Sequence, residues 1–228
     1  MNKNHKSFIC GIKGKYLTKN EKKFLIKYKP WGMILFSRNI ITIKQTKILT
    51  NSIKKLFKNN NYPILIDEEG GRVTRLKKFI DNSIFTAKYF GDLYSKNNKK
   101  FEIYFNVYVK QISYLLRTLG ISINTVPVLD VKRSKSHSII GDRSYSSNKK
   151  VVSKIGDICI EKFHKNRIAT VIKHIPGHGL AKSDSHKKLP IINKKMEYLV
   201  KNDFYSFKNK NSLIAMTGHL LFKNIDNK

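Results

Sequence analysis

The stretch IATVIKHIPGHGLAKSDSHKKLP (residues 168–190) joins a short apolar run to a long polar loop. Its first five residues are apolar or β-branched and short in extent, which is typical of a buried strand. The loop that follows concentrates Lys, His and Asp side chains between prolines and glycines. In proteins built on parallel sheets, the loops at the carboxyl ends of the strands carry the chemistry. The stretch therefore predicts one strand of such a sheet with a functional loop at its end.

Five further apolar runs alternate with segments of helical periodicity along the rest of the chain. The predicted strands are residues 7–12, 32–36, 63–66, 121–126, 168–172 and 212–216. The predicted helices are residues 19–27, 42–57, 100–119, 149–164 and 195–207. No stretch rich in Pro, Gly or Ser marks a domain boundary. This rhythm predicts an α/β fold of βα units in a single domain over residues 1–228.

The composition excludes a mostly disordered chain, because 40% of the 228 residues are hydrophobic. The net charge of +31 suggests an anionic partner such as nucleic acid. The positive residues are 39 Lys against 7 Arg and are spread over the whole chain, whereas proteins that bind phosphate groups favour the bidentate Arg side chain. Nucleic acid is therefore the weaker interpretation, although it stays open.

The two cysteines, Cys10 and Cys159, show neither a disulfide framework nor the spacing of a zinc site. No segment has the length of a membrane span or the apolar core of a secretory signal. We expect a soluble, cytoplasmic protein without a membrane partner.

The loop after the third predicted strand reads ILIDEEGGRVTRL (residues 64–76) and places three acids before a Gly-Gly pair. Arg72 and Arg75 follow the glycines. A carboxylate at a strand end accepts hydrogen bonds from neighbouring sugar hydroxyls, and an Arg orients it. The three acids Asp67, Glu68 and Glu69 are the candidates for this role. A tight turn with a surface ion-pair network is the alternative.

A second loop, VPVLDVKRSKSHSIIGDRSY (residues 126–145), contains Asp130 at the end of a strand and Asp142 and Arg143 after a glycine. Arg143 suggests a geometric requirement, because Arg is scarce in this chain. Asp130 can instead serve as the cap of a turn.

The loop at residues 170–190 holds the most specific pattern, an Asp-x-His pair formed by Asp184 and His186. A carboxylate on one imidazole nitrogen fixes the tautomer and raises the basicity of the ring, so that the other nitrogen can transfer a proton near neutral pH. His178, Asp184 and His186 are also plausible metal ligands. The glycine-rich, polar setting is more typical of a mobile loop than of a rigid coordination cage, and we predict no metal.

Several motifs, taken together and in their order along the chain, resemble glycoside hydrolase family 3. They are PWGMILFSRN, IDEEGGRVTRL, PVLDV with IGDRSY, KHIPGHG with DSH, and MTGH. The resemblance is to the bacterial β-N-acetylglucosaminidases (β-N-acetylhexosaminidases) of muropeptide recycling. It covers essentially the whole chain, and the Asp-x-His pair distinguishes this branch from the β-glucosidases of the family.

The resemblance implies a (β/α)8 TIM-type barrel that hydrolyses terminal β-linked N-acetylglucosamine with retention and without a cofactor. His186, supported by Asp184, would be the general acid and base. The implied substrate-binding residues, all expected on loops at the carboxyl face of the sheet, are Asp67, Arg75, Arg143, Lys173 and His174.

The family's nucleophile is an Asp in an SDD-type motif, and these 228 residues contain no such motif. The only acid after Met216 is Asp226. We therefore expect a barrel incomplete at the C-terminus, with about six βα units and no nucleophile in this chain. A separately encoded C-terminal fragment is a candidate partner. Its ligand would be an N-acetylglucosamine-containing glycan or muropeptide. The alternative functions are a catalytically dead sugar-binding remnant and a basic nucleic-acid-binding protein.

Overall fold

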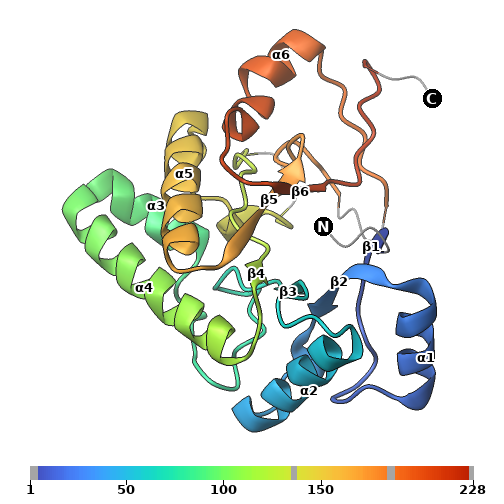
Figure 1. Cartoon of the computed structure of the whole chain (residues 1–228). Helices are drawn as coiled ribbons and strands as arrows, with labels where there is room; N and C mark the ends of the chain where they lie inside the picture. Colours follow the sequence, from blue (N-terminus) through green and yellow to red (C-terminus); the bar gives the residue numbers. More distant parts are fainter. Residues whose placement is uncertain (1–4, 135–137, 184–187, 226–228) are drawn as a thin grey trace.

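A computed structural model of the chain describes residues 5–134, 138–183 and 188–225. Six strands lie side by side in sequence order, and each neighbouring pair is parallel. They are β1 (Lys6–Cys10), β2 (Pro30–Leu35), β3 (Ile64–Ile66), β4 (Ile123–Asn124), β5 (Ala169–Ile175) and β6 (Ile214–Thr217). The sheet curls into half a barrel (Figure 1). All six predicted strands are confirmed, and so is the α/β barrel-type architecture.

Helices connect the strands and cover the outside of the sheet (Figure 1). They are α1 (Lys19–Tyr28), α2 (Ile43–Leu56), α3 (Ala87–Lys96), α4 (Asn98–Thr118), α5 (Lys149–Lys165) and α6 (Met196–Lys201). Helix α1 begins with a capping box, in which the Thr18 hydroxyl accepts a hydrogen bond from the Glu21 amide and the Glu21 carboxylate accepts one from the Thr18 amide. This exchange satisfies amides that the first turn leaves without partners.

The predicted helix over residues 195–207 is wrong in its extent. The structure has α6 and then a separate 3₁₀ helix at Phe204–Phe207. Between them the buried Asp203 carboxylate accepts a hydrogen bond from Arg133 at 3.0 Å. The hydroxyl of Ser206 donates to the carbonyl oxygen of Leu129 at 2.6 Å. These bonds to the loop after β4 hold the chain in a position that a continuous helix does not reach.

Helix α3 is a second difference, because the sequence analysis predicts no helix there. The Thr86 hydroxyl caps it by accepting a hydrogen bond from the Tyr89 amide. The helix also brings Gly91 against the backbone of Tyr145, where a Cβ atom would lie 1.6 Å from the carbonyl oxygen. Tertiary packing thus selects a small residue in the middle of a helix, where propensity alone disfavours it.

The main hydrophobic core lies between the sheet and the helices. It includes Leu35 and Ile66 of the strands together with Leu49 of α2, Ile112 of α4 and Ile155 of α5. The residues that alternate with these along the strands face the inside of the half-barrel. There, Leu65, Ile123 and Val171 are buried, and Trp31, Ile34, Ile214 and Met216 pack on them partly exposed. The inner core is therefore smaller and less covered than the outer one.

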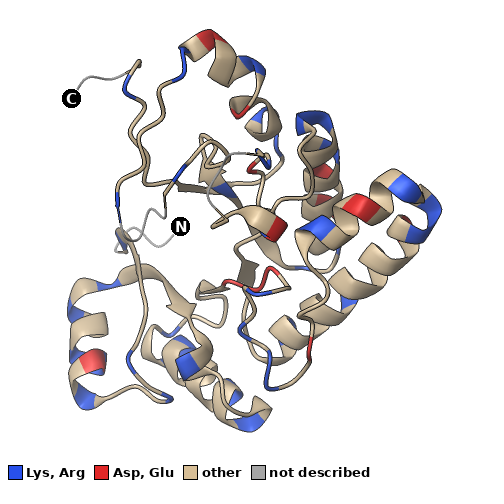
Figure 2. Cartoon of the chain, turned by 180° about the vertical axis from the view of Figure 1, so that it is seen from behind, with Lys and Arg blue, Asp and Glu red and all other residues tan. Residues whose placement is uncertain are grey.

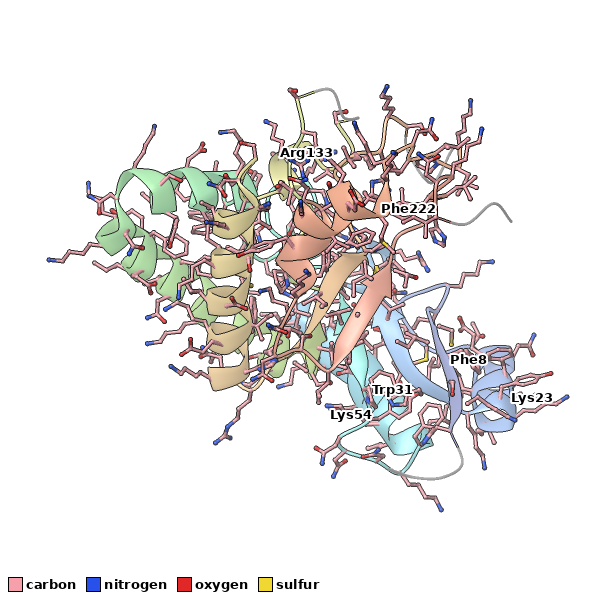
Figure 3. The ribbon with its side chains drawn as sticks, turned by 90° about the horizontal axis from the view of Figure 1, so that it is seen from above. Phe8, Lys23, Trp31, Lys54, Arg133 and Phe222 are labelled. Atoms are coloured by element: carbon pink, nitrogen blue, oxygen red, sulfur yellow. The ribbon has the colours of Figure 1, made fainter. Side chains whose placement is uncertain are left out.

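The loops with the predicted site residues gather at one end of the sheet. Figure 3 shows Arg133, from the loop after β4, at the end of the molecule opposite Trp31, which lies near the start of β2. The loops that follow β3, β4 and β5 all begin at the carboxyl ends of parallel strands. Their side chains consequently meet at one end of the half-barrel, as the strand-and-loop order predicts.

The positive charge is scattered rather than gathered. In Figure 2, Lys and Arg are distributed over helices from both halves of the chain. None of the described helices combines the length and the apolar character that crossing a bilayer requires.

The edges of the sheet lead to a first prediction. Within the described residues, the outer edges of β1 and β6 pair with no other strand, and Ala215 of β6 is exposed. Unpaired edges promote association between chains, and a Lys on the edge opposes it. We expect the 228-residue chain to self-associate with increasing concentration and Ala215→Lys to reduce this, as measured by light scattering.

Tyr114→Lys on the exposed face of α4 is the matched control, because it adds the same charge away from the edges. The control should self-associate like the wild type. A concentration-independent monomer for the wild type would contradict the prediction.

Candidate active site

The three consecutive acids after β3 have different roles. Two glycines with positive φ, Gly70 (+85°) and Gly71 (+61°), reverse the chain directly after the acids. A side chain on Gly70 would put its Cβ atom 2.3 Å from the carbonyl oxygen of Phe85. The reversal directs Asp67 and Glu69 into a cavity. The third acid, Glu68, is buried elsewhere.

Glu68 fastens the loop itself. One carboxylate oxygen accepts hydrogen bonds from the amides of Arg75 (2.7 Å) and Leu76 (3.0 Å), and the other accepts one from the side-chain amide of Asn82 (2.6 Å). Burial raises the pKa of Glu68, and these hydrogen bonds act in the opposite direction. Glu68 therefore holds the loop in place, whereas its two neighbours line the cavity.

Lys173 of β5 is the centre of the charged cluster. Its buried ammonium lies 2.6 Å from Oε1 of Glu69 and 3.2 Å from Oδ1 of Asp67, and it donates to the hydroxyl of Thr125 at 2.8 Å. The Thr125 hydroxyl also donates to Asp67. One cation on β5 thus links two carboxylates of the loop after β3 to the Thr125 hydroxyl after β4.

Two arginines complete the cluster. Arg143 forms a bidentate pair with Glu69, with N···O distances of 2.7 and 2.8 Å. Arg75 lies 3.6 Å from Oδ2 of Asp67. Three cations therefore surround two carboxylates, which leaves an excess of positive charge and of hydrogen-bond donors toward the cavity.

The cations keep both carboxylates ionised. Burial acts to raise the pKa of Glu69, but Lys173 and Arg143 outweigh it and lower that pKa to about 2. Burial likewise acts to raise the pKa of Asp67, and Lys173, the hydrogen bond from Thr125 and Arg75 together bring it below its ordinary value. Both groups are consequently hydrogen-bond acceptors at neutral pH and not proton donors.

An Asp-His pair lies next to this cluster. The fully buried Asp130 carboxylate is 2.7 Å from Nδ1 of His174, and its other oxygen accepts a hydrogen bond from the His178 amide at 2.7 Å. Burial acts to raise the pKa of Asp130, and His174 and the hydrogen bonds lower it below its ordinary value. An ionised carboxylate only accepts, so Nδ1 of His174 carries the proton.

The other ring nitrogen, Nε2 of His174, lies 3.4 Å from the guanidinium of Arg143. It is therefore an acceptor directed toward the cavity side of the ring. Asp130 thus binds the loop after β5 through the His178 amide and fixes the tautomer of His174. Neither this role nor that of Glu69 is predicted from the sequence, in which the signal for Glu69 is its place beside the Gly-Gly pair.

All five predicted substrate-binding residues lie around one cavity of about 360 Å³ at the carboxyl end of the sheet. They are Asp67, Arg75, Arg143, Lys173 and His174. Another part of the wall is apolar and includes Val73, Ile139, Ile140 and Met216. A cavity with charged groups on one part of its wall and apolar groups on another suits a pyranose, which has hydroxyls at its edge and C–H groups on its faces.

The predicted acid/base pair, Asp184 and His186, lies outside the described residues, and so does Asp226. Among the residues that the structure does describe, no three His, Cys, Asp or Glu side chains group as metal ligands would. His178, the third residue of the metal alternative, is buried beside the His174 ring, with the ring centroids 5.9 Å apart.

The half-barrel and its cationic cavity define an α/β protein with a polar ligand site at the carboxyl ends of its strands. Residues 11–228 match the family described as Glycosyl hydrolase family 3 N terminal domain, and the chain therefore belongs to glycosyl hydrolase family 3. This confirms the family that the sequence motifs indicate.

Similar proteins carry names from the same family. A beta-hexosaminidase A from Pseudoalteromonas piscicida is 30% identical over an alignment of 213 positions that covers 90% of this chain and 35% of that protein. A beta-hexosaminidase from Idiomarina loihiensis is 30% identical over an alignment of 229 positions, gaps included, that covers 96% of this chain and 65% of that protein. The chain spans less than two thirds of the length of these curated relatives.

Solved structures agree with the fold in detail. A NagZ from Neisseria gonorrhoeae, in complex with N-trifluoroacetyl-D-glucosamine, superposes with a TM-score of 0.90 at 28% identity and covers 99% of this chain and 67% of that one. A glycoside hydrolase family 3 beta-N-acetylglucosaminidase from Paenibacillus sp. superposes with a TM-score of 0.86 at 26% identity, covering 97% and 42%.

Proposed function

We propose that this chain forms the sugar-binding and acid/base part of a retaining β-N-acetylhexosaminidase. Its substrate is a glycan with a terminal β-linked N-acetylglucosamine, of the kind released from cell walls. The observation that carries the proposal is the cluster in which the Lys173 ammonium links Asp67 and Glu69 beside Arg143, on the wall of a cavity of about 360 Å³. The names of the relatives support the same substrate class.

The cluster matches what a pyranose offers. An ionised Asp67 accepts hydrogen bonds from two adjacent hydroxyls, and Nε2 of His174 accepts from a further one. Arg75 and Arg143 donate to hydroxyl oxygens. Lys173, whose three N–H groups already face Asp67, Glu69 and Thr125, holds the acceptor Asp67 in place. Charge-assisted hydrogen bonds of this kind are stronger than neutral ones. The ion pairs hold the charged groups in place before the ligand arrives, which lowers the cost of ordering them on binding.

The proposed reaction proceeds in two steps with retention. His186, oriented by Asp184, protonates the glycosidic oxygen as the leaving group departs, and a carboxylate attacks the anomeric carbon to form a glycosyl-enzyme. His186 then removes a proton from water, which attacks the same carbon and releases the sugar. In both steps the described cluster holds the pyranose in place.

We infer that the attacking carboxylate is none of the acids that line the described cavity. Asp67 is paired with Lys173 and Arg75, and Glu69 with Lys173 and Arg143. An acid held by two cations is a weak nucleophile, because the same electrostatic stabilisation that lowers its pKa reduces its reactivity. The nucleophile then comes from a segment outside the described residues, in the same polypeptide or in a separately encoded fragment that joins the open side of the half-barrel.

The purified 228-residue chain should therefore not measurably hydrolyse a nitrophenyl N-acetyl-β-glucosaminide, since removing a covalent nucleophile typically lowers turnover by several orders of magnitude. Turnover should appear when a polypeptide with the missing carboxylate is added. The measurement compares the wild type with His186→Ala. Hydrolysis by the wild type alone that this substitution abolishes would show that the chain holds its own nucleophile, and Asp226→Asn would then test the first candidate.

Binding tests the proposal without any turnover. We expect the chain to bind N-acetylglucosamine, measured by calorimetry, and Arg143→Lys to weaken binding by about tenfold or more, because Lys does not reproduce the bidentate pair with Glu69. Arg117→Lys is the matched control, since Arg117 lies on the surface and donates to the carbonyl oxygen of Asn166. Equal affinities for the two variants would contradict the proposed site.

A further inference from the structure

Arg72 has a set of contacts that the proposed reaction does not use. Its Nε donates to Oδ1 of Asp142 at 3.0 Å, and the two N–H groups of its Nη2 are shared among the carbonyl oxygens of Ser138 (2.8 Å), Ile139 (2.6 Å) and Ile140 (3.2 Å). All four acceptors belong to the five residues directly before Arg143. One side chain from the loop after β3 thus holds the backbone of the loop after β4.

Arg72 and the segment that it holds both form part of the cavity wall. Ile139 and Ile140 line the cavity, and a 3₁₀ turn at Gly141–Arg143 leads from them to the guanidinium that pairs with Glu69. The Arg143 amide donates to the Ile140 carbonyl oxygen at 2.8 Å, so the backbone position of one residue sets that of the other. Gly141 has a φ of +46°, a conformation that lets the chain turn this sharply.

We propose that Arg72 is a positioning residue that places the segment 138–143, and through it Arg143 and the apolar wall, for the bound sugar. This inference rests on the proposed sugar site. Arg suits this geometry because two nitrogens of one planar group, Nε and Nη2, reach Asp142 and the carbonyl oxygens at once, whereas a Lys ammonium offers a single nitrogen. Asp142, in the same segment, supplies the fourth acceptor for Arg72.

Because the Arg72–Asp142 pair is partly exposed, its effect on the position of the segment 138–143 can be measured apart from any effect on stability. The side chains of Arg72 and Asp142 are 44% and 40% exposed, and ion pairs that exposed contribute little to the stability of a fold. Loss of Arg72 should therefore leave the protein folded while the segment 138–143 loses its fixed position. A purely structural residue would instead lower thermal stability and affinity together.

Hydrogen exchange and sugar binding, measured on the same variants, test the inference. We expect Arg72→Lys and Arg72→Ala to speed amide exchange in the segment 138–143 and to weaken N-acetylglucosamine binding between about tenfold and a hundredfold, as small displacements of positioning groups do. Asp142→Asn should give a smaller effect in the same direction. The melting temperature should stay close to that of the wild type.

Lys88→Ala is the matched control, because Lys88 forms an equally exposed pair with Asp92 on α3 and should change neither readout. Unchanged exchange in the segment 138–143 would overturn the inference, and so would faster exchange with unchanged affinity. If the wild type binds no N-acetylglucosamine, the proposed sugar site fails, and the exchange data alone still decide whether Arg72 holds the segment.

Discussion

Replacing Glu69 by Gln should lower the free energy of unfolding by about 3 to 5 kcal/mol at neutral pH, the usual cost of removing one partner from a buried ion pair. The Glu69 side chain, only 6% exposed, bridges Lys173 and Arg143, at 2.6 Å from the ammonium and 2.7 Å from the guanidinium. Gln keeps the shape but removes the charge, which leaves the buried Lys173 with Asp67 as its remaining carboxylate partner. Urea unfolding measures the difference.

The pH dependence gives the same prediction a second readout. The pKa of Glu69 lies at about 2 in the folded chain, below its ordinary value of 4.5, so its contribution to stability is present above about pH 4.5 and is lost as the pH falls toward 2. A shift of that size corresponds to about 3 kcal/mol. The difference in stability between wild type and Glu69→Gln should therefore shrink over this range.

Glu102→Gln on α4 is the control, since Glu102 forms a half-exposed pair with Lys162 and should change stability little. Asp67 and Asp130 also have lowered pKa values, so both wild type and variant lose stability in acid, and only their difference reports on Glu69. A difference that stays constant between pH 7 and pH 3 would contradict the assignment of the shift to Glu69.

The strands and the loops of this protein follow from the sequence because their signals are local. Short apolar runs such as residues 63–66 and 168–172 form strands wherever helices cover them, and the loops after them meet because parallel strands share one direction. The capping box at Thr18 likewise needs only residues within one turn. Such features depend on neighbours in the chain, which a sequence displays directly.

The features that the sequence analysis misses depend on distant partners. Helix 195–207 breaks because Asp203 binds Arg133, seventy positions earlier in the chain. The roles of Glu69 and Asp130 appear only when Lys173 and His174 are brought against them by the sheet. An isolated acid in a sequence shows neither its partner nor its burial, and both decide whether it binds a ligand, orients a ring or caps a turn.

Replacing Asp130 by Asn should reverse the tautomer of His174 and weaken N-acetylglucosamine binding by about tenfold or more, as expected when a charged hydrogen-bond partner is lost. The oxygens of Asp130 accept from Nδ1 of His174 and from the His178 amide, both at 2.7 Å. Asn offers only one oxygen. If that oxygen stays on the His178 amide, the NH₂ group faces Nδ1 of His174, and the ring proton has to move to Nε2.

The change of tautomer alters the contact between His174 and Arg143 at the cavity wall. A proton on Nε2 of His174 faces the guanidinium of Arg143 at 3.4 Å, so that two donors oppose each other and the acceptor offered to a sugar hydroxyl disappears. Nitrogen-15 chemical shifts of the imidazole rings distinguish the two tautomers. His164, whose Nε2 lies 3.0 Å from the Thr170 hydroxyl, is an internal reference that should not change. Retention of the Nδ1 proton on His174 in Asp130→Asn, with weakened binding, would show that Asp130 acts by another route than the tautomer.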